Sequence, residues 1–394
     1  MTPAPEAAPR PVRPESPRLT IPFNRPSVVG RESEYMAAAL AEGHISGDGE
    51  FTRRCQDLLM RELGVPSALL TTSGTHALEM AAILSGVGPG DEVIVPDFTF
   101  VSTANAFVLR GATPVFVDIR PDTLNLDERI LEERITPRTR AVVPVHYAGI
   151  GCDMEEIGRI AGRHGLLVVE DNAHGLFARR NGRSLGTIGS LAALSFHETK
   201  NFYCGEGGAL LVNDARLIAR AEIIREKGTD RKRFFRGEVD KYTWRDLGSS
   251  YVLSDLLAAF LLGQLEQKER VLAARRAVFD RYASGLADWA RRTGATLAEI
   301  PPGCESSYHM FYVLLPDREA RSRLIDRLRS RGVLAVFHYL PLHRSEMGRR
   351  WPEPAGGFPV SDSVSERLLR LPFYNTLSPA DQDLVIETVS STGL

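Results

Sequence analysis

A lysine and an aspartate stand at the ends of two apolar segments that are typical of β-strands. Asp171 follows the segment Leu166–Val169, and Lys200 lies in the polar loop after Leu191–Phe196, 29 positions beyond the aspartate. A lone lysine in a loop is most often a solvated residue, so the interpretation depends on the carboxylate at the other strand end. A lysine amine can form a Schiff base with an aldehyde, and a carboxylate can keep a pyridine nitrogen protonated. The pair predicts a pyridoxal 5'-phosphate (PLP) site.

A candidate phosphate cradle lies at the start of a predicted helix. Ser73, Gly74 and Thr75 follow the apolar segment Ala68–Thr71 and precede the helical segment Ala77–Leu84. The first N–H groups of a helix are free to bind a phosphate, and the hydroxyl groups add further donors. Ordinary N-capping by Ser or Thr would explain the same residues without any ligand. The segment alone leaves both explanations open.

Seven apolar segments alternate with helical ones such as Met154–His164, which predicts an α/β fold with a doubly wound, mostly parallel sheet. Ligands of such sheets gather beyond the carboxyl ends of the strands. The candidate cradle, Phe100, His146, Asp171 and Lys200 all fall at such ends, and their agreement is stronger evidence than any one of them. Phe100 would stack on a planar cofactor, although most aromatic residues in such positions only pack. The predicted strands are Ala68–Thr71, Glu92–Pro96, Thr113–Ile119, Ala141–Val145, Leu166–Val169, Leu191–Phe196 and Ala209–Val212.

The C-terminal part mixes shorter elements and two further polar clusters. The loop Gly228–Arg236 is basic and aromatic, which suits either a solvated surface or the binding of a nucleotide. A predicted strand, Ala335–His338, leads to a second histidine at His343, but no third ligand is near, so we expect no metal. A helix is predicted over Ser363–Leu369.

The composition of the 394-residue chain excludes several classes of protein. Its net charge of −2 gives no reason to expect a nucleic acid or an anionic membrane as a partner, and it has no apolar run long enough to span a bilayer. Four scattered cysteines fit free thiols in a reducing cytoplasm. Residues 1–18 are rich in Pro, Ala and Arg and are predicted to be a disordered tail. No P-loop motif is present, and no G-x-G-x-x-G follows the first predicted strand.

Several segments resemble the fold-type I PLP-dependent sugar-nucleotide aminotransferases of the DegT/StrS type. The resemblance implies a large PLP-binding domain over residues 19–255, with a mostly parallel seven-stranded sheet. It also implies a helix linker and a smaller C-terminal α+β domain over residues 256–394. Such enzymes are homodimers that build each site from both chains. The similarity is densest in Phe98–Gly111, Val143–Gly149, Ser195–Asn201, Val239–Asp246 and Ala335–Tyr339.

The resemblance also assigns roles to individual residues. It makes Lys200 the Schiff-base lysine and general base, and Asp171 the partner of the pyridine nitrogen. It places His174 beside the cofactor ring oxygen and Phe100 on the ring face. The implied phosphate-binding groups are Ser73, Gly74, Thr75, the backbone of His76, and Ser195. The implied substrate-binding residues are His197, Arg231, Phe234, Tyr242, His338 and Tyr339, with no metal.

The reaction implied by the resemblance is the transfer of an amino group from glutamate to a nucleotide-linked keto sugar. The similarity favours C4 of dTDP-4-keto-6-deoxy-D-glucose as the acceptor. Amination at C3, or of another nucleotide keto sugar, is the first alternative. A sensor or regulatory protein on the same fold is the alternative from a different class, but it would be expected to lack Lys200 or Asp171.

Overall fold

A seven-stranded sheet organises the first half of the computed structural model, which describes residues 19–393. The predicted disordered tail, residues 1–18, lies outside the described residues. The strand order is β1-β9-β8-β5-β4-β2-β3, and only β9 runs against its neighbours, so the predicted mostly parallel sheet is confirmed. The strands are β1 Ser67–Thr71, β2 Glu92–Pro96, β3 Thr113–Val117, β4 Thr139–Val142, β5 Leu167–Asp171, β8 Leu191–Ser195 and β9 Gly208–Val212.

Helices cover both faces of this sheet because alternate strand residues point to opposite sides. Leu191 and Ala193 pack in the cluster that contains α3 and α4 residues, whereas Ala192 and Leu194 pack with α2 and α8. Helix α5 covers the second face further along, against Val142 and other strand residues. The helices of this part are α1 Glu32–Ala41, α2 Glu50–Leu63, α3 Gly74–Leu84, α4 Val101–Val108, α5 Met154–His164, α6 Ile218–Arg225, α7 Arg231–Phe235 and α8 Asp255–Leu265.

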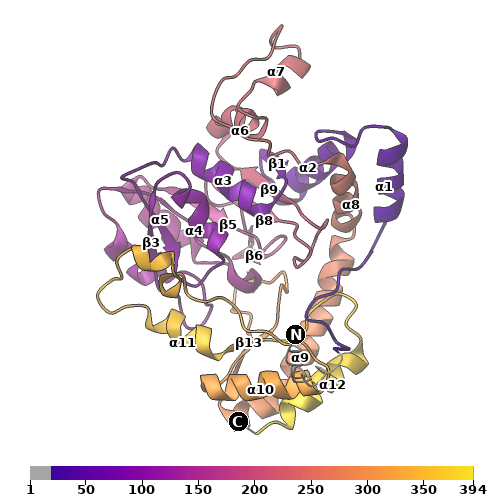
Figure 1. Cartoon of the computed structure of the whole chain (residues 1–394), viewed down its shortest axis with the longest axis vertical. Helices are drawn as coiled ribbons and strands as arrows, with labels where there is room; N and C mark the ends of the chain where they lie inside the picture. Colours follow the sequence, from indigo (N-terminus) through magenta and orange to yellow (C-terminus); the bar gives the residue numbers. More distant parts are fainter. Residues whose placement is uncertain (1–18, 394) are drawn as a thin grey trace, which may run out of the picture.

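An extended segment that carries α7 projects beyond the rest of the molecule (Figure 1). We call residues 226–250 the α7 arm. Two isolated bridges, Glu226 with Ser250 and Thr229 with Trp244, join its outgoing and returning segments. The arm holds the basic and aromatic loop of the sequence analysis, and Trp244 is 80% exposed.

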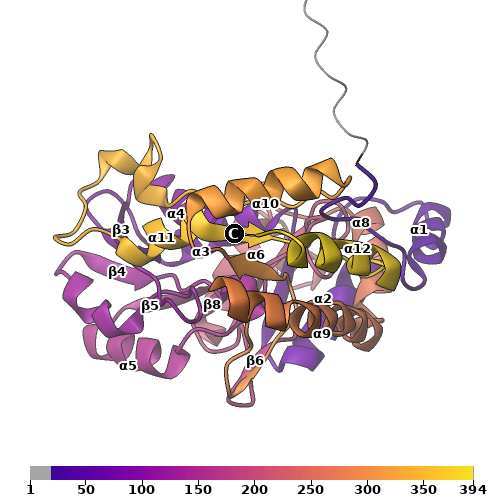
Figure 2. The same ribbon diagram turned by 90° about the horizontal axis from the view of Figure 1, so that it is seen from below.

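The C-terminal part is built around a small antiparallel sheet with the order β10-β12-β13. Helices α9, α10 and α12 lie together at this end of the molecule (Figure 2). A second small sheet, β11-β6-β7, joins this part to the loop after β5. The elements are β6 Arg179–Arg180, β7 Arg183–Ser184, α9 Lys268–Thr293, β10 Thr296–Leu297, β11 Cys304–Glu305, β12 Tyr312–Leu314, α10 Arg318–Ser330, α11 Pro359–Arg367, β13 Leu368–Arg370 and α12 Pro379–Ser390.

Two predicted elements of this part are wrong. Ala335–His338 is not a strand: only Val336 pairs, through an isolated bridge to Arg370. The predicted helix Ser363–Leu369 ends at Arg367, and its last residues instead begin β13, which pairs with β12. Leu368 and Leu369 suit either structure by their apolarity, and pairing with β12 decides between them.

The division between the two parts lies at a helix junction. Helix α8 packs with α1 and α2 in the core of the first part, whereas α9 residues such as Val278 and Trp289 pack in the C-terminal core. The predicted boundary at residue 255 stays a proposal, in which α8 and α9 form the helix linker between the two domains. In the part of the chain that the structure describes, no helix is both long and apolar enough to cross a membrane.

Candidate active site

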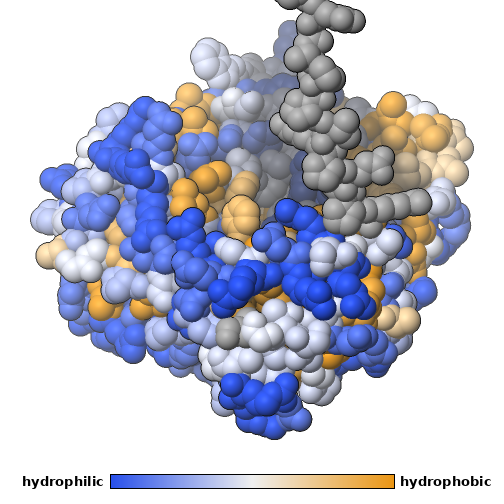
Figure 3. Space-filling model, turned by 60° about the horizontal axis from the view of Figure 1, so that its bottom comes forward, coloured by the Kyte–Doolittle hydropathy of each residue, from blue (hydrophilic) through white to orange (hydrophobic). Residues whose placement is uncertain are grey.

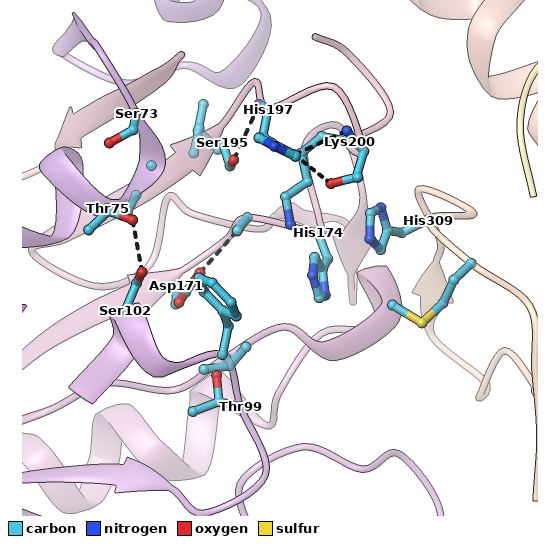
Figure 4. Close-up of a pocket in the computed structure, with 18 of the residues that line it drawn as sticks. Ser73, Thr75, Thr99, Ser102, Asp171, His174, Ser195, His197, Lys200 and His309 are labelled. Atoms are coloured by element: carbon cyan, nitrogen blue, oxygen red, sulfur yellow. Dashed lines mark hydrogen bonds between the residues drawn. The ribbon is translucent and has the colours of Figure 1, made fainter. Parts of the chain in front are cut away.

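A cavity of about 320 Å³ lies at the carboxyl edge of the large sheet, between it and the C-terminal part. In Figure 4, Ser73, Thr75 and Ser195 lie on one side of this cavity, and His174 and His309 lie on the other. Sequence segments far apart in the chain therefore meet here. The predicted residues that line the cavity are Ser73, Gly74, Thr75, Phe100, Asp171, His174, Ser195, His197, Lys200 and Tyr339.

Asp171 is the last residue of β5 and is buried. Its Oδ2 accepts a hydrogen bond from Thr103 Oγ1 at 2.7 Å, and its Oδ1 accepts one from the Ala173 N–H at 3.2 Å. Burial raises the pKa of the Asp171 carboxyl, while these two hydrogen bonds oppose that change. Because a cationic ring nitrogen would also favour the carboxylate, the site is suited to hold a protonated pyridine.

Lys200 is half-buried in the loop after β8. Its backbone N–H donates to the His197 carbonyl at 2.9 Å, which closes a tight turn. Burial lowers the pKa of the Lys200 amine to about 8, a change that the Asp171 carboxylate opposes and Arg370 reinforces. An amine with this pKa is partly neutral near pH 7 and can act as a nucleophile or a base.

The start of α3 forms the predicted cradle. Ser73 caps the helix by accepting from the His76 N–H at 3.0 Å, and Thr75 Oγ1 lies 2.8 Å from Ser102 Oγ. No group within residues 19–393 accepts from the N–H groups of Gly74 and Thr75. These free amides and the neighbouring hydroxyls form a site for a phosphate group.

Glycine is required at position 74 by the close approach of α3 to β8. A Cβ added there would lie 2.9 Å from Ser195 Cβ and 3.2 Å from the Leu194 carbonyl oxygen. The approach brings the α3 amides beside the Ser195 hydroxyl. The free amides, the close-packed glycine and the buried Asp171 together fit PLP: the α3 amides could hold its phosphate, and Asp171 could hold its ring nitrogen.

Two neutral imidazoles form the opposite wall. The rings of His174 and His309 are stacked, with centroids 4.1 Å apart and planes inclined by 13°. Asn201 Nδ2 donates to the Ser307 carbonyl, so Asn201 Oδ1 accepts from His309 Nδ1, at 2.9 Å. Burial and the nearby Lys200 hold the pKa of His174 well below its usual range, and burial and His174 do the same for the pKa of His309.

Aromatic residues close the side of the cavity nearest the C-terminal part. Tyr339 lies 6.2 Å from Phe100, between ring centroids, and stacks on His338 at 3.6 Å. His338 does not line the cavity itself: its Nδ1 lies 2.6 Å from the Tyr147 hydroxyl. Phe100 is 55% exposed, which leaves its ring free to cover a planar ligand.

Two predicted residues are directed away from the cavity. The His146 Nδ1 accepts from the Cys152 N–H, so its Nε2 donates to Glu170 Oε2 at 2.8 Å inside the core. His146 was wrongly placed among the ligand-facing residues, because its backbone lies at the strand edge but its side chain turns inward. The His76 ring packs against Tyr251, and the backbone N–H of His76 already donates to the Ser73 hydroxyl. The implied contact of this backbone with a phosphate therefore stays a prediction.

The three predicted substrate residues of the α7 arm do not reach this cavity within one chain. Arg231 lines a separate cavity of about 920 Å³ beside α6 and pairs with Glu226. Phe234 and Tyr242 are 38% and 50% exposed. Their role in substrate binding stays a prediction that requires a second chain.

Sequence reasoning missed the cavity residues Phe23, His309 and Arg370. It also missed Thr103, which does not line the cavity but donates to Asp171. Thr103 is on α4, four residues after Thr99, and its hydroxyl lies between the Thr99 hydroxyl and the Asp171 carboxylate. Arg370 had the clearest signal, because a charged residue between Leu369 and Leu371 interrupts an apolar strand.

No group of three or more metal-binding side chains occurs within residues 19–393. His343, the second histidine of the motif considered for a metal, bonds through Nδ1 to Asp97 Oδ2 at 2.7 Å. His338 contacts the Tyr147 hydroxyl and His343 contacts Asp97, so the two imidazoles bind different partners.

Known proteins align with nearly the whole chain. The sequence profile of the DegT/DnrJ/EryC1/StrS aminotransferase family matches residues 26–390. GDP-perosamine synthase of Caulobacter vibrioides (strain ATCC 19089 / CIP 103742 / CB 15) is 34% identical over 374 residues, which are 94% of this chain and 97% of that protein. The spore coat polysaccharide biosynthesis protein SpsC of Bacillus subtilis (strain 168) is 32% identical over 377 residues, covering 94% and 96% of the two chains.

Solved structures share the same fold. A structure from Streptococcus pneumoniae assigned as a sugar aminotransferase, in its PLP-form, superposes with a TM-score of 0.86 at 27% identity. It covers 94% of this chain and 98% of its own. The chain thus belongs to the DegT/DnrJ/EryC1/StrS aminotransferase family and is a PLP-dependent sugar aminotransferase of fold-type I.

Proposed function

We propose that this protein transfers the amino group of glutamate to C4 of dTDP-4-keto-6-deoxy-D-glucose. The product is a dTDP-4-amino-4,6-dideoxyhexose for surface polysaccharide or antibiotic aminosugar biosynthesis. Glutamate is oxidised by two electrons to 2-oxoglutarate, and the sugar carbonyl is reduced by the same two electrons to an amine. The observation that carries the proposal is the meeting of Lys200, Asp171 and the α3 phosphate cradle in one cavity.

The chain's own residues divide the work of the reaction. When bound, PLP supplies an electron-poor ring that stores the electron pair left when the donor loses its α-proton. Asp171 would hold the ring nitrogen by accepting its hydrogen bond, and the Thr103 hydroxyl fixes the orientation of the carboxylate. The Lys200 amine takes the α-proton from the donor and later delivers a proton to C4 of the sugar.

The acceptor is proposed from the resemblance of the sequence motifs, with support from the α7 arm. Arg231, Phe234 and Tyr242 combine a guanidinium with aromatic rings, a set suited to a diphosphate and a base. The relative named GDP-perosamine synthase makes a GDP-linked keto sugar the first alternative acceptor. Amination at C3 of the sugar is the next alternative.

We also propose a cytoplasmic homodimer in which each α7 arm reaches the cavity of the partner. Trp244 and Phe235 on the arm are 80% and 70% exposed. On the face seen in Figure 3, by contrast, hydrophobic residues are interspersed among hydrophilic ones. Exposed aromatic residues concentrated on one arm are typical of a contact with another protein surface.

The deciding experiment incubates the purified protein with PLP, glutamate and dTDP-4-keto-6-deoxyglucose, followed by mass and NMR analysis of the sugar nucleotide. An amino sugar with nitrogen at C4 is the expected result, and its coupling constants give the configuration. A parallel reaction contains a GDP-linked 4-keto-6-deoxy sugar. Faster amination of the GDP sugar, or a C3 amine, would replace the proposed acceptor, and the Lys200→Ala variant serves as the blank.

A further inference from the structure

Arg370 is a charged residue held rigidly in an apolar strand. Its backbone pairs on one side with Tyr312 in β12 and on the other with Val336, whose carbonyl accepts from the Arg370 N–H at 2.7 Å. Leu369 and Leu371 on either side of it are fully buried in the C-terminal core. Because strand residues alternate between faces, the Arg370 side chain points the other way, into the active-site cavity.

The guanidinium of Arg370 has no anionic partner in the chain. Within residues 19–393 its buried Nε makes no hydrogen bond, and no carboxylate forms an ion pair with the group. Burying a charged group without a partner is costly, and native structures usually retain such a group for a ligand. A planar guanidinium with free N–H groups is suited to bind a carboxylate through two parallel hydrogen bonds.

Phe23 holds this guanidinium in place. The guanidinium carbon lies 4.6 Å from the centroid of the Phe23 ring, a stacking distance for arginine on an aromatic face. The Phe23 carbonyl accepts from the Phe373 N–H at 3.1 Å, and Ile21 forms a parallel bridge with Val333. The segment before α1 is therefore fixed to the C-terminal part, so the ring has little freedom to move.

The other charged groups of the cavity already have partners or tasks. Asp171 would face the pyridine nitrogen and Lys200 would carry the cofactor, while Glu206 lies 3.7 Å from His197. The phosphate of PLP has its own cradle at α3, on the side of the cavity opposite His174 and His309 (Figure 4). Arg370 pairs with Val336, and His338, two residues further on, lies 6.4 Å from His174 between ring centroids, so Arg370 is on the side of the histidines.

We propose that Arg370 binds the α-carboxylate of the amino donor and that Phe23 is its positioning residue. The donor's α-carbon must lie at Lys200, which exchanges its proton, and the α-carboxylate is one bond from that carbon. The keto sugar has no such group and does not use Arg370 as an anion site. This inference rests on the proposed function only in requiring an amino acid as the donor.

The test separates the two half-reactions of the PLP-loaded enzyme. Glutamate alone is mixed with the enzyme, and the absorbance change from PLP to pyridoxamine phosphate is followed in the wild type, Arg370→Gln and Arg370→Lys. Loss of one charge-assisted pair is expected to raise the half-saturating glutamate concentration about 10- to 100-fold in Arg370→Gln. Arg370→Lys should recover only part of this loss because it lacks the planar fork. Phe23→Leu should show a smaller increase with the same spectrum.

A binding measurement and a matched control guard against simple unfolding. Calorimetry with glutarate, a dicarboxylate without an amino group, should show the same loss of affinity in Arg370→Gln, whereas titration with dTDP should be unchanged. Arg25→Gln is the control, because Arg25 also lies over an aromatic ring, that of Tyr374 at 5.8 Å, but does not line the cavity. Unchanged glutamate and glutarate binding in Arg370→Gln overturns the proposal, as does weakened dTDP binding. The glutamate half-reaction is observable whichever sugar the enzyme accepts, so failure of the proposed acceptor is a separate outcome.

Discussion

Lys200 and its charged neighbours determine when its amine is neutral. Burial brings the pKa of that amine to about 8, so below this pH most of it is protonated and unreactive, and above this pH most of it is free. Asp171 raises the pKa and Arg370 lowers it, so the two groups act on the amine with opposite signs.

The first prediction uses these opposite signs in the protein freed of PLP. The rate at which an amine-specific reagent labels Lys200, followed by mass spectrometry, should rise through a midpoint near pH 8, while exposed lysines react with midpoints near pH 10. Asp171→Asn should move the midpoint to lower pH, and Arg370→Gln should move it to higher pH. Shifts in the same direction for both variants would contradict the assigned charges.

Thr103 is the residue that orients the Asp171 carboxylate. Because its single hydroxyl proton goes to Asp171 Oδ2, the hydrogen bond between Thr99 and Thr103, at 2.9 Å, must be donated by Thr99. Thr103→Val keeps the shape but leaves the buried carboxylate short of one donor, at a cost of about 1.5–3 kcal/mol. We expect weaker PLP retention in dialysis and a roughly tenfold slower glutamate half-reaction.

The control for this prediction lies one turn earlier in the same segment. Thr99→Val removes only the outer hydrogen bond and leaves the bond to Asp171 intact. It should therefore retain PLP nearly as well as the wild type. Equal losses in the two valine variants would mean that Thr103 acts by packing rather than by orienting the carboxylate.

The sequence predicted the residues that lie at strand ends and missed those brought in by the fold. Asp171 and Lys200 could be identified because each follows an apolar strand, and parallel strands end at one edge. Thr103 is 68 residues from Asp171, and its contact depends on how α4 docks beside β5. The charge of Arg370 within an apolar segment is a local signal, but the cavity that it faces depends on how the C-terminal part folds back over the sheet.

Among the elements, α3 is the one whose placement decides cofactor binding. Its first turn lies against the end of β8, and the contact at Gly74 leaves no room for a side chain. Gly74→Ala should push α3 away from Ser195, and the affinity for PLP should fall about tenfold or more, as for loss of one hydrogen bond to a charged group. Titration of PLP into the protein freed of cofactor measures this change.

Two controls connect that loss to the phosphate. Pyridoxal, which lacks the phosphate, should bind wild type and Gly74→Ala with similar affinity, because only the cradle is disturbed. Gly158→Ala in α5 is the matched substitution: a Cβ there meets nothing within 4 Å. It should leave PLP affinity unchanged and stabilise the helix by about 0.5–1 kcal/mol. A loss of PLP affinity in Gly158→Ala would make the effect at Gly74 unspecific.

Apolar pattern predicted where the main strands and helices lie but not how every strand runs. The segment Ala209–Val212 has the same composition as the parallel strands, yet β9 is antiparallel to both β1 and β8. The connection of β8 to β9, residues 196–207, contains no helix and continues the hairpin, with the Phe196 N–H donating to the Gly207 carbonyl at 2.8 Å. The direction of β9 therefore depends on the connecting segment and not on the composition of the strand.

At the scale of the whole molecule, one chain holds Lys200 and Asp171 in its cavity, whereas its predicted substrate-binding residues on the α7 arm lie outside that cavity. Arg231, Phe234 and Tyr242 are on the α7 arm, which projects from the body and does not line the cavity of its own chain (Figure 1). A two-fold dimer would let each arm complete the site of its partner, since isologous contacts are reciprocal. Such a dimer can be tested without a structure of the assembly.

The last prediction is that two inactive variants restore activity when they are mixed. Lys200→Ala lacks the reacting amine, and a variant with Arg231→Ala and Phe234→Ala lacks the substrate contacts of the arm. In a mixed dimer, the chain with the altered arm retains its own Lys200 and receives an intact arm from its partner. With random pairing, half of the dimers are mixed and one of their two sites is intact, so about a quarter of wild-type activity should return. If each arm instead served its own chain, every site in the mixed dimer would carry a defect, and mixing would restore no activity.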